Sequence, residues 1–168
     1  MVLLSYTGIM VLLLTLQALG FPLAYHLGGA LPNMGLLLII FVSLSRGSFF
    51  GLFLGTFAGW YLDVNSFLPF GFHIIIFSTI GFFLGKIRDA FSLDRFFGPF
   101  LVSLAVAILV NLFAIILNAI FSLEILPSIF SMTTLLEIVY SAIMGPVFFA
   151  ITNFFEKIFK RRPGGQYL

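Results

Sequence analysis

Six apolar runs, joined by short connectors, make up nearly the whole chain. Five of them approach the length of about 20 residues that a helix needs to cross the hydrocarbon core of a bilayer. None alternates apolar and polar residues with a period of two, as the strands of a membrane β-barrel do. The runs cover residues 2–23, 32–45, 47–62, 69–87, 96–121 and 132–155. The sequence therefore predicts an all-α integral membrane protein, built as a six-transmembrane-helix bundle.

Three of the predicted helices have features of their own. The helix over residues 32–45 is short, so we expect it to be tilted or covered by its neighbours. The last helix contains Pro146, which we expect to kink it. The first helix has neither a basic start nor a small-residue cleavage site, and we interpret it as a retained helix, not a signal peptide.

The composition agrees with a membrane protein. Hydrophobic residues are 61% of the 168 residues and charged residues only 8%. A soluble domain of this size could not bury so much apolar surface. We therefore expect one membrane domain over residues 1–160 and a disordered cytoplasmic tail over residues 161–168.

The basic residues predict how the bundle is oriented. If six helices cross the membrane, all eight Lys and Arg residues fall on the side that holds both termini. Basic residues in short loops mark the cytoplasm, so we expect both termini to be cytoplasmic. Lys86, Arg88 and Arg95 form a candidate cytoplasmic anchor. Without interleaved aromatic residues on a soluble surface, these residues do not indicate nucleic-acid binding.

Glycines recur at every fourth position along the predicted third helix. Residues four apart share a helix face, so these glycines form a groove in which another backbone can approach closely. The candidate packing or partner-binding glycines are Gly47, Gly51, Gly55 and Gly59, with Gly81 and Gly85 in the fourth helix. We favour packing of these two helices on each other; contact with a partner protein is the alternative.

Asp63 continues the glycine row to the outer end of its helix. We expect the next helix to start at Pro69, with Gly71 and His73 in its first turns. The Asp63 carboxylate can then accept hydrogen bonds from the exposed amides of that helix start and organise the outer loop. A proton relay or metal pair formed with His73 is the weaker alternative, because no further ligand stands nearby in the sequence.

Three other polar side chains interrupt the last two apolar runs. Asn111 and Asn118 share a helix face, and we expect them to hydrogen-bond between helices. Glu137 lies near the outer end of the last helix. We interpret it as a candidate for an external cavity or a partner contact, with simple exposure at the membrane interface as the alternative.

Catalysis is the function class that the sequence supports least. The chain lacks the H-E-x-x-H, G-x-S-x-G and phosphate-loop motifs, which place metal ligands, a nucleophile or phosphate-binding amides. Cysteine is absent, which excludes thiolate chemistry and Cys-ligated metals. We therefore expect no enzyme activity, no metal and no cofactor.

The segment GTFAGWYLDVNSFLPFGFHIIIFSTIGFFLGKIRD, within residues 47–90, resembles the central signature of the bacterial rod shape-determining MreD family. The resemblance lies in a glycine-rich helix ending in Leu-Asp, a Pro-x-Gly-x-His start, an apolar helix, and Gly-x-x-x-Gly before basic residues. The matching residues are Gly55, Gly59, Leu62, Asp63, Pro69, Gly71, His73, Gly81, Gly85, Lys86 and Arg88.

This resemblance implies a non-catalytic, multi-pass scaffold or regulatory subunit of the rod (elongation) complex in the bacterial cytoplasmic (inner) membrane. Its implied role is to help direct lateral peptidoglycan synthesis. The implied partners are a bitopic MreC-like protein, the MreB filament, and RodA with its class B penicillin-binding protein. We expect the partner's membrane helix to contact the third and fourth helices.

The resemblance also leaves an alternative function open. The MreD family is similar in fold to the substrate-binding subunits of energy-coupling-factor vitamin transporters. A small-molecule-binding subunit of a transporter is therefore the second hypothesis.

Overall fold

A computed structural model describes residues 2–19, 30–66, 68–88, 97–121 and 131–160. These residues form helices and connecting turns without a strand, which confirms the predicted all-helical class for this part of the chain. The helices are α1 (Val2–Leu19), α3 (Met34–Arg46), α4 (Ser48–Asn65), α5 (Phe72–Lys86), α6 (Phe97–Phe121) and α8 (Met132–Lys160). The predicted tail over residues 161–168 lies outside the described residues.

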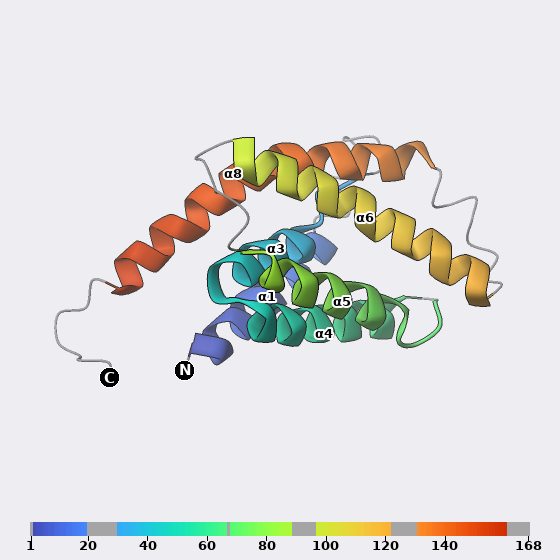
Figure 1. Cartoon of the computed structure of the whole chain (residues 1–168), viewed down its shortest axis with the longest axis horizontal. Coiled ribbons are helices and arrows are strands. Elements are labelled where there is room, and N and C mark those ends of the chain that lie inside the picture. Colours follow the sequence, from blue (N-terminus) through green and yellow to red (C-terminus); the bar gives the residue numbers. More distant parts are fainter. Residues whose placement is uncertain (1, 20–29, 67, 89–96, 122–130, 161–168) are drawn as a thin grey trace.

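Two helices are long and apolar enough to cross a membrane, over Phe97–Phe121 in α6 and Met132–Phe154 in α8. With a rise of about 1.5 Å per residue, α6 is roughly 37 Å long, more than the hydrocarbon core of about 30 Å. Pro146 lies inside α8, and Figure 1 shows α8 changing direction along its length. The other apolar helices are shorter.

The short helix α3 lies at the centre of the bundle and contacts α1, α4, α5, α6 and α8. All residues over 35–44 are buried. Among them, the ring of Phe41 meets Phe149 of α8 edge to face, with 5.3 Å between the ring centroids. The prediction that this helix is covered by its neighbours is therefore confirmed, and burial explains how a helix of only 13 residues is stable here.

Two helix starts differ from the sequence prediction. The helix predicted from residue 32 begins at Met34, because the Asn33 side chain caps it by accepting a hydrogen bond from the Leu36 amide at 3.0 Å. The helix predicted to start at Pro69 begins instead at Phe72. Gly71 directly precedes it with a φ of +103°, a left-handed conformation that cannot continue a helix and that glycine adopts without strain.

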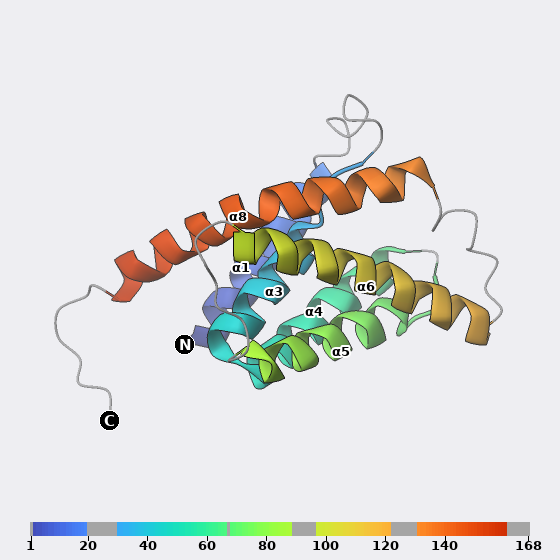
Figure 2. The same ribbon diagram turned by 45° about the horizontal axis from the view of Figure 1, so that its top comes forward.

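The helices form two antiparallel pairs beside the central α3 (Figure 1). α4 packs on α5, and α6 packs on α8. In Figures 1 and 2, the first turn of α1, the α3–α4 junction, the last turn of α5 and the end of α8 all lie toward the left. The basic residues Arg46, Lys86 and Arg88 therefore gather toward one end of the molecule, opposite the α4–α5 loop.

Candidate functional site

The glycine face of α4 packs directly on the backbone of α5. A Cβ atom added to Gly51, Gly55 or Gly59 would overlap atoms of the facing helix. The backbones that it would meet belong to Gly81, Phe77 and Ile74. Only residues without a side chain permit this approach. The groove that the sequence indicates is therefore occupied by α5 of the same chain, and a partner helix would have to contact another face.

The glycines of α5 take part in the same contact. A Cβ on Gly81 would overlap the carbonyl group of Gly51, and one on Gly85 would overlap the backbone of Ser48. Gly47 directly precedes α4 and has a φ of +93°, a positive value that glycine adopts without strain. It therefore also allows the turn between α3 and α4. Close backbone contact therefore runs along the whole pair.

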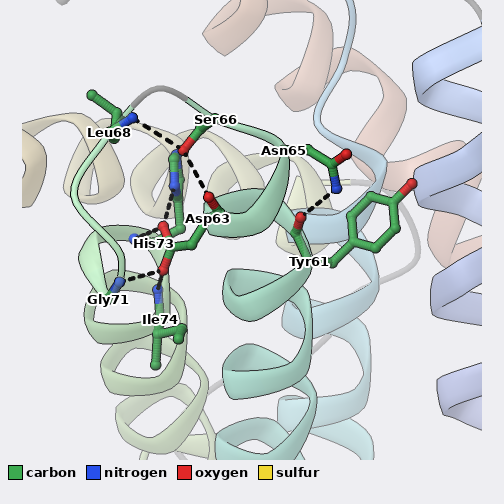
Figure 3. Close-up of polar contacts among 8 residues, drawn as sticks. All are labelled: Tyr61, Asp63, Asn65, Ser66, Leu68, Gly71, His73 and Ile74. Atoms are coloured by element: carbon green, nitrogen blue, oxygen red, sulfur yellow. Dashed lines mark hydrogen bonds and ion pairs between the residues drawn. The ribbon is translucent and has the colours of Figure 1, made fainter.

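The carboxylate of Asp63 closes this pair at the α4–α5 loop (Figure 3). Its side chain is fully buried. Oδ2 accepts hydrogen bonds from the backbone amides of Gly71 at 2.9 Å and Ile74 at 3.2 Å. Oδ1 accepts the amide of His73 at 2.9 Å and lies 2.7 Å from Nδ1 of the same residue. The last turn of α4 thus supplies the cap for the start of α5.

This arrangement has a physical reason on both helices. The first amides of a helix lack partners within the helix, and the N-terminal end of its dipole favours a negative charge. Gly71, at the N-cap position of α5, has no side chain to satisfy them. Nδ1 of His73 lies 2.7 Å from Oδ1 of Asp63 and donates a hydrogen bond to it in the tautomer that carries its proton on Nδ1. Asp63 thereby satisfies three partly buried backbone donors and contacts one imidazole.

The geometry favours capping over metal binding at this position. The residues that the structure describes contain no group of three or more His, Cys, Asp or Glu side chains that could hold a metal ion. Both oxygens of Asp63 already accept hydrogen bonds from the protein. The metal alternative for Asp63 and His73 thus gains no structural support, whereas the relay alternative stays a prediction, because the 2.7 Å contact between Oδ1 and Nδ1 is compatible with both a cap and a relay.

Pro69 has a smaller part in the same loop. Its carbonyl oxygen accepts a hydrogen bond from the amide of Phe72 at 3.2 Å, which closes the turn before α5. At the end of α4, the amide of Ser66 donates to the carbonyl of Asp63 at 3.4 Å. The loop is therefore organised at both of its ends, with the Asp63 carboxylate joining them.

Glu137 lies in a polar cluster inside the bundle, not in an open outer cavity. With Asn33, Asn111 and Ser141 it lines a cavity of about 20 Å³, room for about one water molecule. The hydroxyl of Ser141 accepts a hydrogen bond from the Asn33 amide at 2.9 Å. The expectation of an external cavity at Glu137 is therefore not met by this pocket.

Gln17 of α1 adds another polar contact that sequence analysis missed. Its Oε1 accepts a hydrogen bond from the amide of Met34 at 3.1 Å, so α1 and α8 both help to satisfy the start of α3. A single Gln in an apolar run was the available signal.

The side-chain amide of Asn111 donates a hydrogen bond to the carbonyl of Ala107 in its own helix at 2.9 Å, whereas a bond between helices was expected. Asn118 is buried.

The candidate cytoplasmic anchor is partly described. Lys86 is exposed, and its ammonium group lies 4.8 Å from the ring centroid of Phe82. Arg88 is also exposed, with its guanidinium group beside Gly47. Arg95 lies outside the described residues. Two of the three basic side chains are therefore known to project at the same end of α5.

Comparison with protein families shows what kind of protein carries this arrangement. The family model described as rod shape-determining protein MreD matches residues 1–155. This chain belongs to the MreD family. The resemblance noted over residues 47–90 thus extends over nearly the whole sequence. MreD proteins are membrane proteins involved in rod shape determination, and theirs is not known as an enzyme family.

No individual curated protein and no solved structure gives a significant match to this chain. The similarity in fold between the MreD family and the substrate-binding subunits of vitamin transporters therefore stays a prediction for this protein. The glycine pair and the Asp63 cap both lie within the matched range.

Proposed function

We propose that this MreD protein is a non-catalytic, multi-pass scaffold of the bacterial inner membrane that binds the membrane helix of an MreC-like bitopic protein. The observation that carries this proposal is the family match over residues 1–155. The structure contributes a closely packed α4–α5 pair, which offers a rigid surface. Through this contact, the protein helps direct lateral peptidoglycan synthesis by the rod complex.

The proposed orientation has six crossings with both termini in the cytoplasm. Its support is that Arg46 ends α3, Lys86 ends α5 and the Arg88 guanidinium lies beside Gly47. In Figures 1 and 2, these helix ends lie toward the same end of the molecule as the start of α1 and the end of α8. Basic residues favour the cytoplasmic side. In this orientation the Asp63 loop faces outward, and the basic end faces the MreB filament and anionic lipid.

The outer face of α4 is the surface we assign to the partner helix. Phe49, Phe53, Trp60 and Val64 are all exposed, and their spacing places them on one side of the helix. This side is opposite the glycines that α5 covers. Helices associate in lipid through close packing, not through the hydrophobic effect, so a preformed face of rigid aromatic side chains is suited to this contact.

The test is affinity purification of the tagged protein in mild detergent, with mass spectrometry of the retained proteins and small molecules. We expect an MreC-like protein to be retained, with RodA and its class B penicillin-binding protein. The double variant Phe53→Ala, Trp60→Ala should lose most of the MreC-like protein. The matched control is Leu101→Ala, on an exposed position of α6, and it should retain the partner.

Two results would overturn the proposal. One is retention of an ATPase-linked transporter module or a vitamin in place of wall-synthesis proteins. The other is equal recovery of the MreC-like protein with both sets of variants, which would remove the outer face of α4. The polar cavity beside Glu137 gives the transporter alternative little support, because its 20 Å³ is far below the roughly 300–1,000 Å³ of small-molecule sites.

A further inference from the structure

An apolar groove runs between α5 and α6, which lie side by side in Figures 1 and 2. Its volume is about 420 Å³, and Thr79 is the one polar residue among the ten that line it. Half of the lining side chains are exposed, so the groove is open along one side. These exposed residues are Phe83, Ile87, Leu109, Leu112 and Ile116.

The size of the groove indicates what it holds. On α6 it extends from Val106 to Ile116, roughly 15 Å at the usual helical rise. This is about half of the 30 Å hydrocarbon core, the depth of one leaflet. An extended acyl chain of one leaflet matches this length, and the apolar lining suits it.

The charge at one end of the groove indicates the head group. Ile87 lines the groove at the end of α5, and the residues on either side of it are Lys86 and Arg88. Both side chains are exposed. The Lys86 ammonium lies over the Phe82 ring at 4.8 Å, which keeps it at the level of the last turn of α5. Basic side chains at the membrane surface attract anionic head groups.

We propose that one anionic phospholipid binds MreD here, with an acyl chain in the α5–α6 groove and its phosphate at Lys86. An apolar chain and a charged contact together give a more lasting attachment than either alone. This site goes beyond the scaffold function and does not depend on the MreC-like partner. It would let the lipid composition of the inner leaflet act on the α5–α6 contact.

The experiment uses the full chain in nanodiscs that contain equal amounts of phosphatidylglycerol and phosphatidylcholine with identical acyl chains. Native mass spectrometry then counts the lipids that stay with the released protein. We expect the wild type to retain one phosphatidylglycerol with about fivefold preference, the effect typical of one basic residue at a membrane surface. Lys86→Gln should abolish the preference, whereas Arg46→Gln, an equal loss of charge at the same end, should keep it.

The groove itself is tested by filling it. Leu112→Trp places a large ring in the groove and should reduce retention of both lipids, as should Ile116→Trp if the first variant fails to fold. Ile108→Trp is the matched control, since Ile108 is exposed on α6 but does not line the groove. Equal retention of the two lipids by the wild type would overturn the proposal. Unchanged lipid retention in Leu112→Trp would also overturn it. So would a Leu112→Trp variant that keeps the lipid but loses the MreC-like protein in the affinity purification.

Discussion

The two antiparallel helix pairs of this protein are held together in different ways. In the α4–α5 pair, backbone meets backbone at Gly51, Gly55 and Gly59, and the buried carboxylate of Asp63 closes one end. In the α6–α8 pair, side chains fill most of the contact. Only 28% of the apolar window in each of its helices is buried. The first pair is built for fixed geometry, and the second exposes most of its surface to its surroundings.

This difference indicates how a small membrane protein can combine a rigid element with a large lipid-facing surface. Residues 35–44 of α3 are buried, and the glycine face of α4 is buried against α5, so the geometry of these contacts is set within the chain. The long helices α6 and α8 contact α3, and both are long and apolar enough to cross a membrane. Substitutions should therefore be tolerated less well in the α4–α5 pair than in the α6–α8 pair.

The most disruptive change should be Gly55→Leu. The new side chain would overlap the backbone of Phe77, which cannot move aside without separating the two helices. We expect a loss of more than about 3 kcal/mol in unfolding free energy, at or above the upper end for overpacked sites. The measurement is thermal unfolding in mild detergent, together with recovery of the MreC-like partner.

Gly8→Leu is the matched control, because no atom lies within 4 Å of a Cβ at Gly8 in α1. That variant should unfold within a few degrees of the wild type. Comparable losses at Gly8 and Gly55 would mean that the glycine contact does not distinguish the α4–α5 pair.

The next largest effect should come from Asp63→Leu. This change leaves the amides of Gly71, His73 and Ile74 without their acceptor. An unsatisfied buried donor costs about 1–3 kcal/mol, and these three are only partly buried, so we expect the lower end of that range for each, a total of about 3 kcal/mol. Asp63→Asn keeps one acceptor oxygen and should lose about 1 kcal/mol. Stability in detergent and rescue of rod shape in cells are the two measurements; equal tolerance of Leu and Asn would contradict the capping role.

A smaller effect is expected from Gly145→Ala in the α6–α8 pair. A Cβ there would overlap the hydroxyl of Ser103, but that atom ends a small side chain. We expect a loss of about 1–2 kcal/mol, since overpacking against a side chain can be relieved. Ser103→Gly should restore most of the lost stability in the double variant. Failure of that rescue would show that the backbone of α6 sets the contact, as in the α4–α5 pair.

The smallest effect, and one of opposite sign, should follow Ser103→Ala. The Ser103 hydroxyl is buried and has no hydrogen-bond partner. Removing it eliminates the cost of an unsatisfied polar group, so we expect a gain of up to about 1 kcal/mol. Differential scanning fluorimetry in detergent would detect it as a higher unfolding temperature. A lower temperature would show that Ser103 has a stabilising contact, which would bring the two pairs closer in character.

Sequence analysis predicted the helices well because apolar runs and their connectors have a direct physical meaning in a membrane protein. The Asp63 interaction was also predictable in kind, since a carboxylate near a helix start meets free amides. Its details were not, because the left-handed Gly71 moves the start of α5 from Pro69 to Phe72.

Other features were beyond sequence analysis for a specific reason. Gln17 and Ser141 each lie in a mostly apolar run. Nothing in either run indicates that both side chains accept hydrogen bonds from amides at the start of α3. The residues that line the α5–α6 groove are of the same types as those on any lipid-facing surface, so the sequence does not distinguish the groove from such a surface. Such features depend on which helices become neighbours.

The Asp63 cap has a consequence for how the protein enters the membrane. The first turn of α5 has no cap of its own and depends on a residue from α4. The amides of this turn are partly buried and accepted by Asp63, and a partly buried amide without an acceptor destabilises a helix, so α5 is a poor independent insertion unit. We expect α4 and α5 to leave the translocation machinery together, as a hairpin whose second helix becomes stable only when the first is already in place.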